Sequence, residues 1–121
     1  VKKYNYKFEK NNLPINLDRI TVNDLGFNGP TELLDIYNKL ESSGFKLVSP
    51  EVAIYSRLIY LDQPTGEWIR FATPLKSMID TDGVPHLPKL GSALGKKFIE
   101  TYWSYPKAIF HPHNDFIVQS K

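Results

Sequence analysis

Residues 56–74 (SRLIYLDQPTGEWIRFATP) constrain the fold of this chain more than any other stretch. Two runs rich in aliphatic, aromatic and β-branched residues, 56–61 and 67–73, flank a short polar break. The break at residues 63–66 suits a type I turn, because Pro64 presets the backbone φ angle at its second position. We therefore predict a central β-hairpin. Other elements must cover it, since a two-stranded ribbon is only marginally stable alone.

Residues 30–43 carry the clearest helical pattern. Their apolar side chains recur at i, i+3, i+4 and i+7, which places them in one stripe along a helix. Pro30 suits a first helical turn, and Gly44 suits the left-handed residue that ends a helix. The sequence thus predicts a helix over residues 30–43 that packs on the sheet. The stripe consists of Leu33, Ile36, Tyr37 and Leu40.

The first ten residues alternate between aromatic and polar or charged side chains. Tyr4 and Phe8 fall on one side of an extended strand, and Lys3 and Lys7 fall on the other. Exposed lysines discourage edge-to-edge pairing between sheets. We predict an edge strand with its lysines outward.

The second half of the chain adds shorter elements. Residues 98–105 alternate as a strand does, whereas residues 89–97 are predicted to form a short helix weakened by two glycines. Residues 74–79 are expected to form one helical turn before a polar turn at residues 80–83. Residues 108–110 and 116–119 are predicted to pair with each other as a second hairpin.

Two segments fit more than one structure. Within residues 11–29, Pro14 and the two asparagines before it indicate a loop, residues 19–22 suit a short strand, and residues 23–26 suit a turn. Residues 49–55 begin with Ser-Pro-Glu, which suits a helical turn, but their apolar residues equally suit an extension of the next strand.

Length and composition indicate one folded unit. A chain of 121 residues, 41% hydrophobic and 13% aromatic, is long enough and apolar enough to bury a core. The predicted elements give a single α+β domain spanning residues 1–121. We expect an antiparallel sheet of about four to six strands, with the helix over residues 30–43 packed on it.

The positive charge is concentrated at the N-terminus. Four lysines and one glutamate give the first ten residues a net charge of +3. Since the formal net charge of the whole chain is +2, the charges of the other 111 residues sum to −1. A nearly neutral body is not typical of a nucleic-acid-binding domain, so weak binding through the basic N-terminal strand is kept only as an alternative. The sequence has no cysteine and no apolar run of membrane-spanning length. We therefore expect a cytoplasmic protein without a membrane partner.

The sequence HPHND at residues 111–115 is the sharpest chemical motif. His111, His113 and Asp115 have the spacing of residues that bind zinc or other divalent ions, and His86 is a further ligand candidate. The set suggests a metal-binding protein or a small metal-dependent hydrolase. A proline-containing turn explains the same residues without a metal, because Pro112 suits its second position. No cofactor is expected unless a divalent metal occupies this turn.

A second candidate site lies in the predicted central hairpin. Trp68 and Arg70 share one side of their strand, and Arg57 lies nearby in the predicted pairing. Trp and Arg dominate the energetics of many binding surfaces. The chain has no cysteine nucleophile and no serine in a G-x-S-x-G setting. We therefore expect a non-enzymatic module that binds a protein or peptide partner.

Overall fold

The computed structural model of the chain describes residues 2–10 and 13–121. Its elements, in chain order, are β1 (Lys2–Lys10), β2 (Leu13–Thr21), the 3₁₀ turn η1 (Asn23–Leu25), β3 (Thr31–Glu32), α1 (Leu33–Ser42), α2 (Pro50–Ile59), β4 (Trp68–Phe71), β5 (His86–Ala93), β6 (Lys96–Trp103), β7 (Ile109–Phe110) and β8 (Asp115–Gln119).

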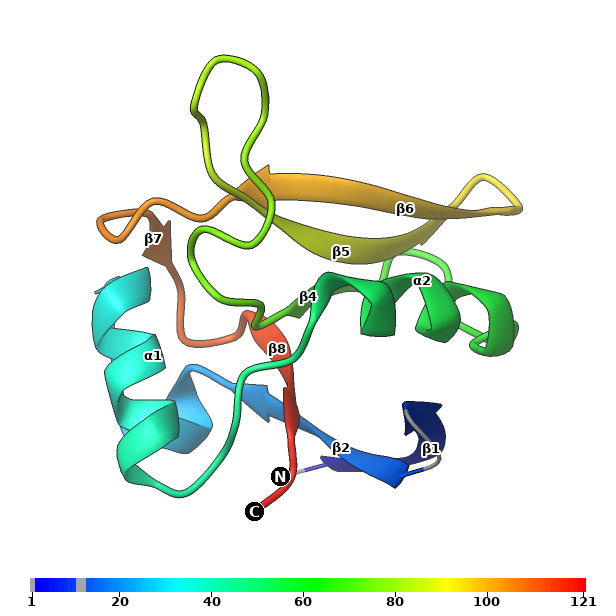
Figure 1. Ribbon diagram of the computed structural model, residues 1–121, viewed down its shortest axis with the longest axis horizontal. Helices are drawn as coiled ribbons and strands as arrows, with labels where there is room; N and C mark the ends of the chain where they lie inside the picture. The colour runs from blue at the N-terminus through cyan, green and yellow to red at the C-terminus, as the bar shows by residue number, and fades with distance from the viewer. Residues whose placement is uncertain (1, 11–12) are drawn as a thin grey trace.

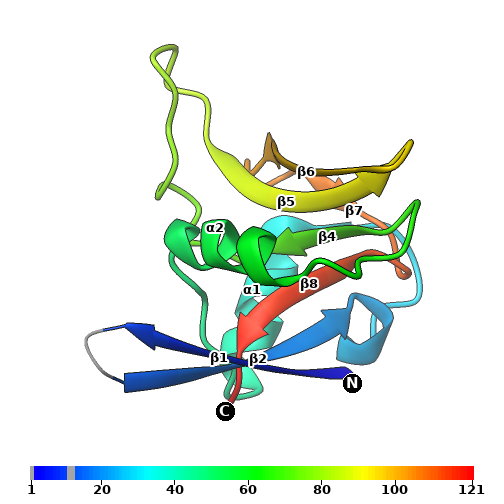
Figure 2. The same cartoon turned by 90° about the vertical axis from the view of Figure 1, so that its right-hand side faces the viewer.

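Six strands form one twisted sheet in the order β1-β2-β8-β4-β5-β6 (Figures 1 and 2). Neighbouring strands are antiparallel except β4 and β8, which run parallel and make the sheet mixed. β3 and β7 form a separate two-stranded sheet. The predicted α+β class is confirmed, and six strands agree with the expected range. The predicted antiparallel character holds for every neighbouring pair of this sheet except β4 and β8, whose parallel pairing joins residues far apart in the chain.

The two helices cover opposite faces of the large sheet. Successive residues of a strand point to opposite faces, so Phe116 and Val118 pack in the cluster with α1, whereas Ile117 packs in the cluster with α2. Figure 1 shows α1 and α2 on either side of β4 and β8. Burial of apolar side chains on both faces therefore holds the three layers together.

The first helix agrees closely with its prediction. All four residues of the predicted stripe, from Leu33 to Leu40, are buried. Gly44 has a φ of 93°, and its N–H bonds to the carbonyl of Glu41. The N–H of Phe45 bonds to the carbonyl of Leu40, which completes a Schellman motif. The helix begins later than expected because Thr31–Glu32 pairs with β7.

The predicted central hairpin is half wrong. Residues 56–61 were expected to be a strand, but most of them belong to α2, which starts with Pro50 in the first turn after Ser49. Residues 67–73 do contain a strand, β4, and its antiparallel partner is β5. The apolar run before the turn fits either structure, and the Ser-Pro-Glu start decides for the helix.

The helix predicted at residues 89–97 is also wrong, because β5 and β6 form a tight hairpin there. Leu94 and Gly95 have φ angles of 52° and 73°, as in a type I′ turn, which favours hairpins. Residues 74–79 form a bend and a turn instead of a helical turn, with the Ser77 N–H bonded to the Pro74 carbonyl.

The predicted second hairpin is wrong in its pairing but right in its turn. β7 pairs with β3, and β8 inserts between β2 and β4. Residues 111–114 do form a turn, closed by a 3.0 Å bond from the Asn114 N–H to the His111 carbonyl. At the N-terminus, β1 is an edge strand as predicted, while the direction of its lysine side chains lies outside what the structure describes.

Candidate functional site

The three residues of the predicted binding patch lie on two sides of the sheet. Trp68 and Arg70 belong to β4 and face away from α2, because the intervening Ile69 packs in the α2 cluster. Arg57 belongs to α2 and lies on the other side. The structure therefore brings Trp68 and Arg70 together and separates Arg57 from them.

Arg57 ties α2 to the strands beneath it. Its Nη1 donates to Gln63 Oε1 at 2.7 Å and to the carbonyl oxygens of Gly91 and Phe98 at 3.1 and 3.0 Å. Its Nη2 donates to the Tyr60 carbonyl at 2.6 Å. This partly buried guanidinium satisfies carbonyl groups within the fold, which indicates a structural role.

Trp68 lies flat across β5. A Cβ atom at Gly91, the residue paired with Trp68, would lie only 2.1 Å from the indole ring. Trp68 also stacks with Phe98 on β6, with ring centroids 6.5 Å apart and planes within 7°. Lys89 Nζ lies 4.7 Å from the Trp68 ring centroid, within the range of a cation–π interaction. These residues make a flat aromatic surface on the face away from α2.

Arg70 continues this surface on the same face of the sheet, toward Phe110 of β7. Its Cζ lies 6.0 Å from the Tyr102 ring centroid and 5.6 Å from that of Phe110. Its Nε is buried without a hydrogen-bond partner among the described residues. Burial lowers the pKa of Arg70, and this outweighs the electrostatic effects of Tyr102 and Asp115, which raise it.

The four predicted metal ligands do not gather in one place. His111 and His113 are exposed, and their rings stack with centroids 6.1 Å apart. Asp115 accepts a hydrogen bond from Arg19 Nε at 2.8 Å, and His86 Nε2 lies 3.0 Å from Asp80 Oδ2. In the part of the chain that the structure describes, no three His, Cys, Asp or Glu side chains are placed to hold a metal ion. The geometry supports the turn interpretation, and metal binding stays a prediction.

His86 and Asp80 belong to a network that shapes the loop between β4 and β5. Asp80 Oδ1 accepts hydrogen bonds from the backbone N–H groups of Asp82 and Val84, at 2.9 and 3.0 Å. The hydrogen bond with His86 is the largest of the effects that lower the pKa of Asp80. A surface groove of about 300 Å³ adjoins this pair, lined by Met78, Ile79, Asp80, His86 and Thr101.

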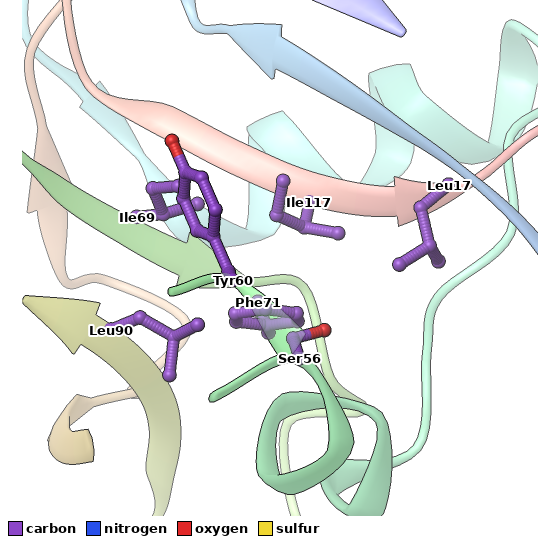
Figure 3. A pocket seen from close by; sticks show the side chains of 7 residues that line it. All are labelled: Leu17, Ser56, Tyr60, Ile69, Phe71, Leu90 and Ile117. Carbon is purple, nitrogen blue, oxygen red and sulfur yellow. The ribbon is translucent and has the colours of Figure 1, made fainter. Parts of the chain in front are cut away.

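The space inside the α2 cluster is too small for a substrate. It has a volume of about 10 Å³, which is close to the minimum for one water molecule. Figure 3 shows its lining of mostly apolar side chains, with the Tyr60 hydroxyl directed away. Ser56 contributes a hydroxyl that is buried without a hydrogen-bond partner in the described residues. The other lining residues are Leu17, Ile69, Phe71, Leu90 and Ile117.

An ion-pair network lies on the same side of the sheet as α2. Arg19 pairs with Glu67 at 2.9 Å and with Asp115, and the other Glu67 oxygen accepts from the Tyr60 hydroxyl at 2.8 Å. These side chains are mostly buried and satisfy one another, which indicates that they join β2, β4 and β8 to α2.

The outer side of α2 is a site that the sequence prediction missed. Its buried residues are Val52, Ala53 and Ser56, while larger apolar side chains of the same helix face solvent. The solvent-facing residues are Ile54, Tyr55, Leu58 and Ile59, and Leu61 follows just beyond the helix. These four helical residues are spaced at i, i+1, i+4 and i+5, which would have revealed a second apolar stripe if the segment had been predicted as a helix.

Among the described residues, no helix is both long enough and apolar enough to span a membrane. No protein-family model, curated protein sequence or solved structure matches the chain.

Proposed function

We propose that this chain is a non-enzymatic interaction module that binds an extended segment of a partner protein along α2 and β6. The apolar stripe on the solvent side of α2 is the observation that carries this proposal. Ile54 is 56% exposed, Leu58 is 66% exposed and Leu61 is 72% exposed. Contiguous exposed apolar residues of this kind are typical of surfaces that bind other proteins.

β6 continues this surface at the edge of the sheet. It pairs with β5 and is the last strand in the order, so one side of its backbone is available to a further strand (Figure 2). Ile99 lies opposite Leu90, which packs under α2, so Ile99 and Trp103 face the α2 side. Both are exposed, at 44% and 58%, and α2 contacts β6 directly.

The chemistry of the partner follows from these two elements. An added strand would form backbone hydrogen bonds with β6 and present every second side chain to the α2 side. Apolar residues at alternate positions would cover Ile99 and Trp103. An acidic residue would suit the end of β6 where Lys96 and Lys97 stand. We place this partner in the cytoplasm, as the cysteine-free composition leads us to expect.

A displayed library of random peptides tests the proposal without a known partner. Peptides would be selected on the wild-type protein and counter-selected on a folded Ile54→Lys/Leu58→Lys variant. We expect the enriched peptides to alternate apolar residues and to lose binding to the variant by about tenfold or more, because a charged side chain disrupts an apolar contact.

Leu34→Lys is the matched control. Leu34 is 43% exposed on α1, which covers the opposite face of the sheet from α2, so this variant adds a charge at an exposed leucine of a different surface. Peptides should bind it as they bind the wild type. Peptides that bind all three proteins equally would contradict the proposal.

A further inference from the structure

Two cations stand side by side on the sheet face away from α2. Arg70 on β4 pairs directly with Lys89 on β5, and Lys89 pairs with Glu100 on β6. Like charges directly opposite each other on neighbouring strands are destabilising. Glu100 compensates only Lys89, at 3.9 Å and with half of its side chain exposed, so the attraction is weak. This row of the sheet therefore carries an excess of positive charge beside Arg70.

Arg70 differs from the other two arginines of the chain. Arg19 forms ion pairs with two carboxylates, and Arg57 donates to one side-chain and several backbone oxygens. Within the described residues, the Arg70 guanidinium has no hydrogen bond and no ion pair, and its Nε is buried. A partly buried guanidinium without an acceptor is costly, because desolvation is not repaid by new hydrogen bonds.

The neighbouring side chains form flat aromatic walls around the two cations. The Tyr102 ring lies close to both, with its centroid 5.4 Å from Lys89 Nζ and 6.0 Å from Arg70 Cζ. Trp68 lies on the other side of Lys89 and is held flat over Gly91. Aromatic faces of this kind stack on planar rings of ligands as well as on cations.

We propose that this face binds a small ligand with a phosphate monoester and a planar ring. The phosphate would lie between Arg70 and Lys89, where its two negative charges match two cations and its oxygens accept hydrogen bonds from the guanidinium and ammonium groups. Because Arg70 Nε is buried, the phosphate meets the terminal nitrogens of the guanidinium. The planar ring stacks on Trp68. This site lies on the opposite face from α2 and is independent of the proposed peptide surface.

Adenosine 5′-monophosphate, inorganic phosphate and adenosine are suitable probes of the site. Binding would be followed through Trp68 fluorescence in a Trp103→Phe background, since these are the two tryptophans of the chain. We expect saturable binding of adenosine 5′-monophosphate, weaker binding of inorganic phosphate, and a further loss of about tenfold or more for adenosine, which lacks the charge. Absence of saturable binding by both phosphate compounds would overturn the proposal.

Two variants and a control assign the binding to these residues. Arg70→Met and Lys89→Met should each weaken binding of adenosine 5′-monophosphate by about tenfold or more, because each removes a charge-assisted hydrogen bond. Lys97→Met is the control, since Lys97 alternates with Phe98 and lies on the other face. Thermal unfolding checks that each variant is folded, and Lys89→Met still decides the question if Arg70→Met is not. Unchanged binding by a folded Arg70→Met or Lys89→Met variant would contradict the proposed contacts.

Discussion

The Arg57 guanidinium on α2 donates a 3.1 Å hydrogen bond to the carbonyl of Gly91, the residue of β5 over which Trp68 lies. Two of the residues predicted to share a binding patch thus meet the same glycine from opposite faces of the sheet. On the α2 side, Arg57 donates hydrogen bonds to backbone oxygens, and on the other side the Trp68 ring packs over Gly91. This relationship makes Arg57 part of the fold and leaves Trp68 with Arg70 as surface residues.

We predict that Arg57→Met destabilises the protein by about 2 kcal/mol. The substitution keeps much of the aliphatic side chain but removes every hydrogen bond to Gln63, Gly91 and Phe98, and hydrogen bonds to charged groups contribute about 1.5–3 kcal/mol. Urea unfolding measures the change. The exposed Lys76 provides a control, since Lys76→Met should leave stability within about 0.5 kcal/mol. Equal stability of both variants would show that the Arg57 hydrogen bonds do not stabilise the fold.

Gly91→Ala should destabilise the protein by about 1–3 kcal/mol, the usual cost of overpacking. The new Cβ would lie 2.1 Å from the Trp68 ring, so the indole must leave its place over β5. Urea unfolding gives the stability, and fluorescence in the Trp103→Phe background shows the movement of Trp68.

A double-mutant cycle tests the cause of that loss. With Trp68→Ala already present, Gly91→Ala should cost at least about 1 kcal/mol less than it does in the wild type, because the clashing ring is gone. An identical cost in both backgrounds would place the strain in the backbone of β5 and not in the contact with Trp68.

The sequence predicted α1 well because independent signals agreed there. The stripe from Leu33 to Leu40, the stop at Gly44 and the return contact of Phe45 all indicate one helix with one buried side. Only the predicted start of the helix was wrong. Thr31–Glu32 pairs with β7, which lies more than 70 residues further along the chain, and no local sequence pattern reveals such a contact.

The sequence failed at α2 because its apolar residues are distributed around the helix. A segment with apolar side chains on its exposed side as well as on its buried side resembles a buried strand. That error also misplaced Arg57, whose side of the sheet depends on the helix. Trp68 and Arg70 were placed correctly on one face, because alternation along a strand needs no knowledge of the partner strand.

Ser56→Ala should be neutral or should stabilise the protein by up to about 1 kcal/mol. The Ser56 hydroxyl is buried against apolar side chains, and no described residue bonds to it, so removing it relieves a desolvation cost. Alanine also favours the helix in which it would stand.

Ser104 is the matched control for Ser56. It is equally buried, but its hydroxyl donates a 3.0 Å hydrogen bond to the Leu75 carbonyl. Ser104→Ala should therefore cost about 1 kcal/mol in chemical unfolding. A loss of similar size for Ser56→Ala would indicate that the Ser56 hydroxyl has an acceptor after all.

We predict that protonation of Asp80 contributes to the loss of folding stability at acid pH. Hydrogen bonds from His86, Val84 and Asp82 lower the pKa of Asp80 below its ordinary value of 3.8. Because the folded pKa is the lower one, Asp80 stabilises the fold above pH 3.8, and the contribution is lost as the pH falls through the folded pKa.

Thermal unfolding between about pH 2 and pH 6 measures this contribution. The wild type should lose more of its midpoint temperature across this range than Asp80→Asn, which has no carboxylate to protonate at this position. Asp82→Asn serves as the control and should follow the wild type, since Asp82 contributes only its backbone N–H to the network. Parallel curves for wild type and Asp80→Asn would exclude Asp80 as a source of acid sensitivity.

Leu94→Asn should stabilise the protein by about 0.5–1 kcal/mol. Leu94 has a φ of 52°, a left-handed conformation that leucine adopts at a cost and that asparagine tolerates. It is followed by Gly95, so the substitution creates the Asn-Gly pair that type I′ hairpin turns prefer. Leu94→Ala separates this backbone effect from the loss of an exposed apolar side chain, because alanine keeps the unfavourable φ. Chemical unfolding should show a gain for asparagine and none for alanine. A gain of equal size in both variants would attribute it to the removal of the side chain and not to the geometry of the turn.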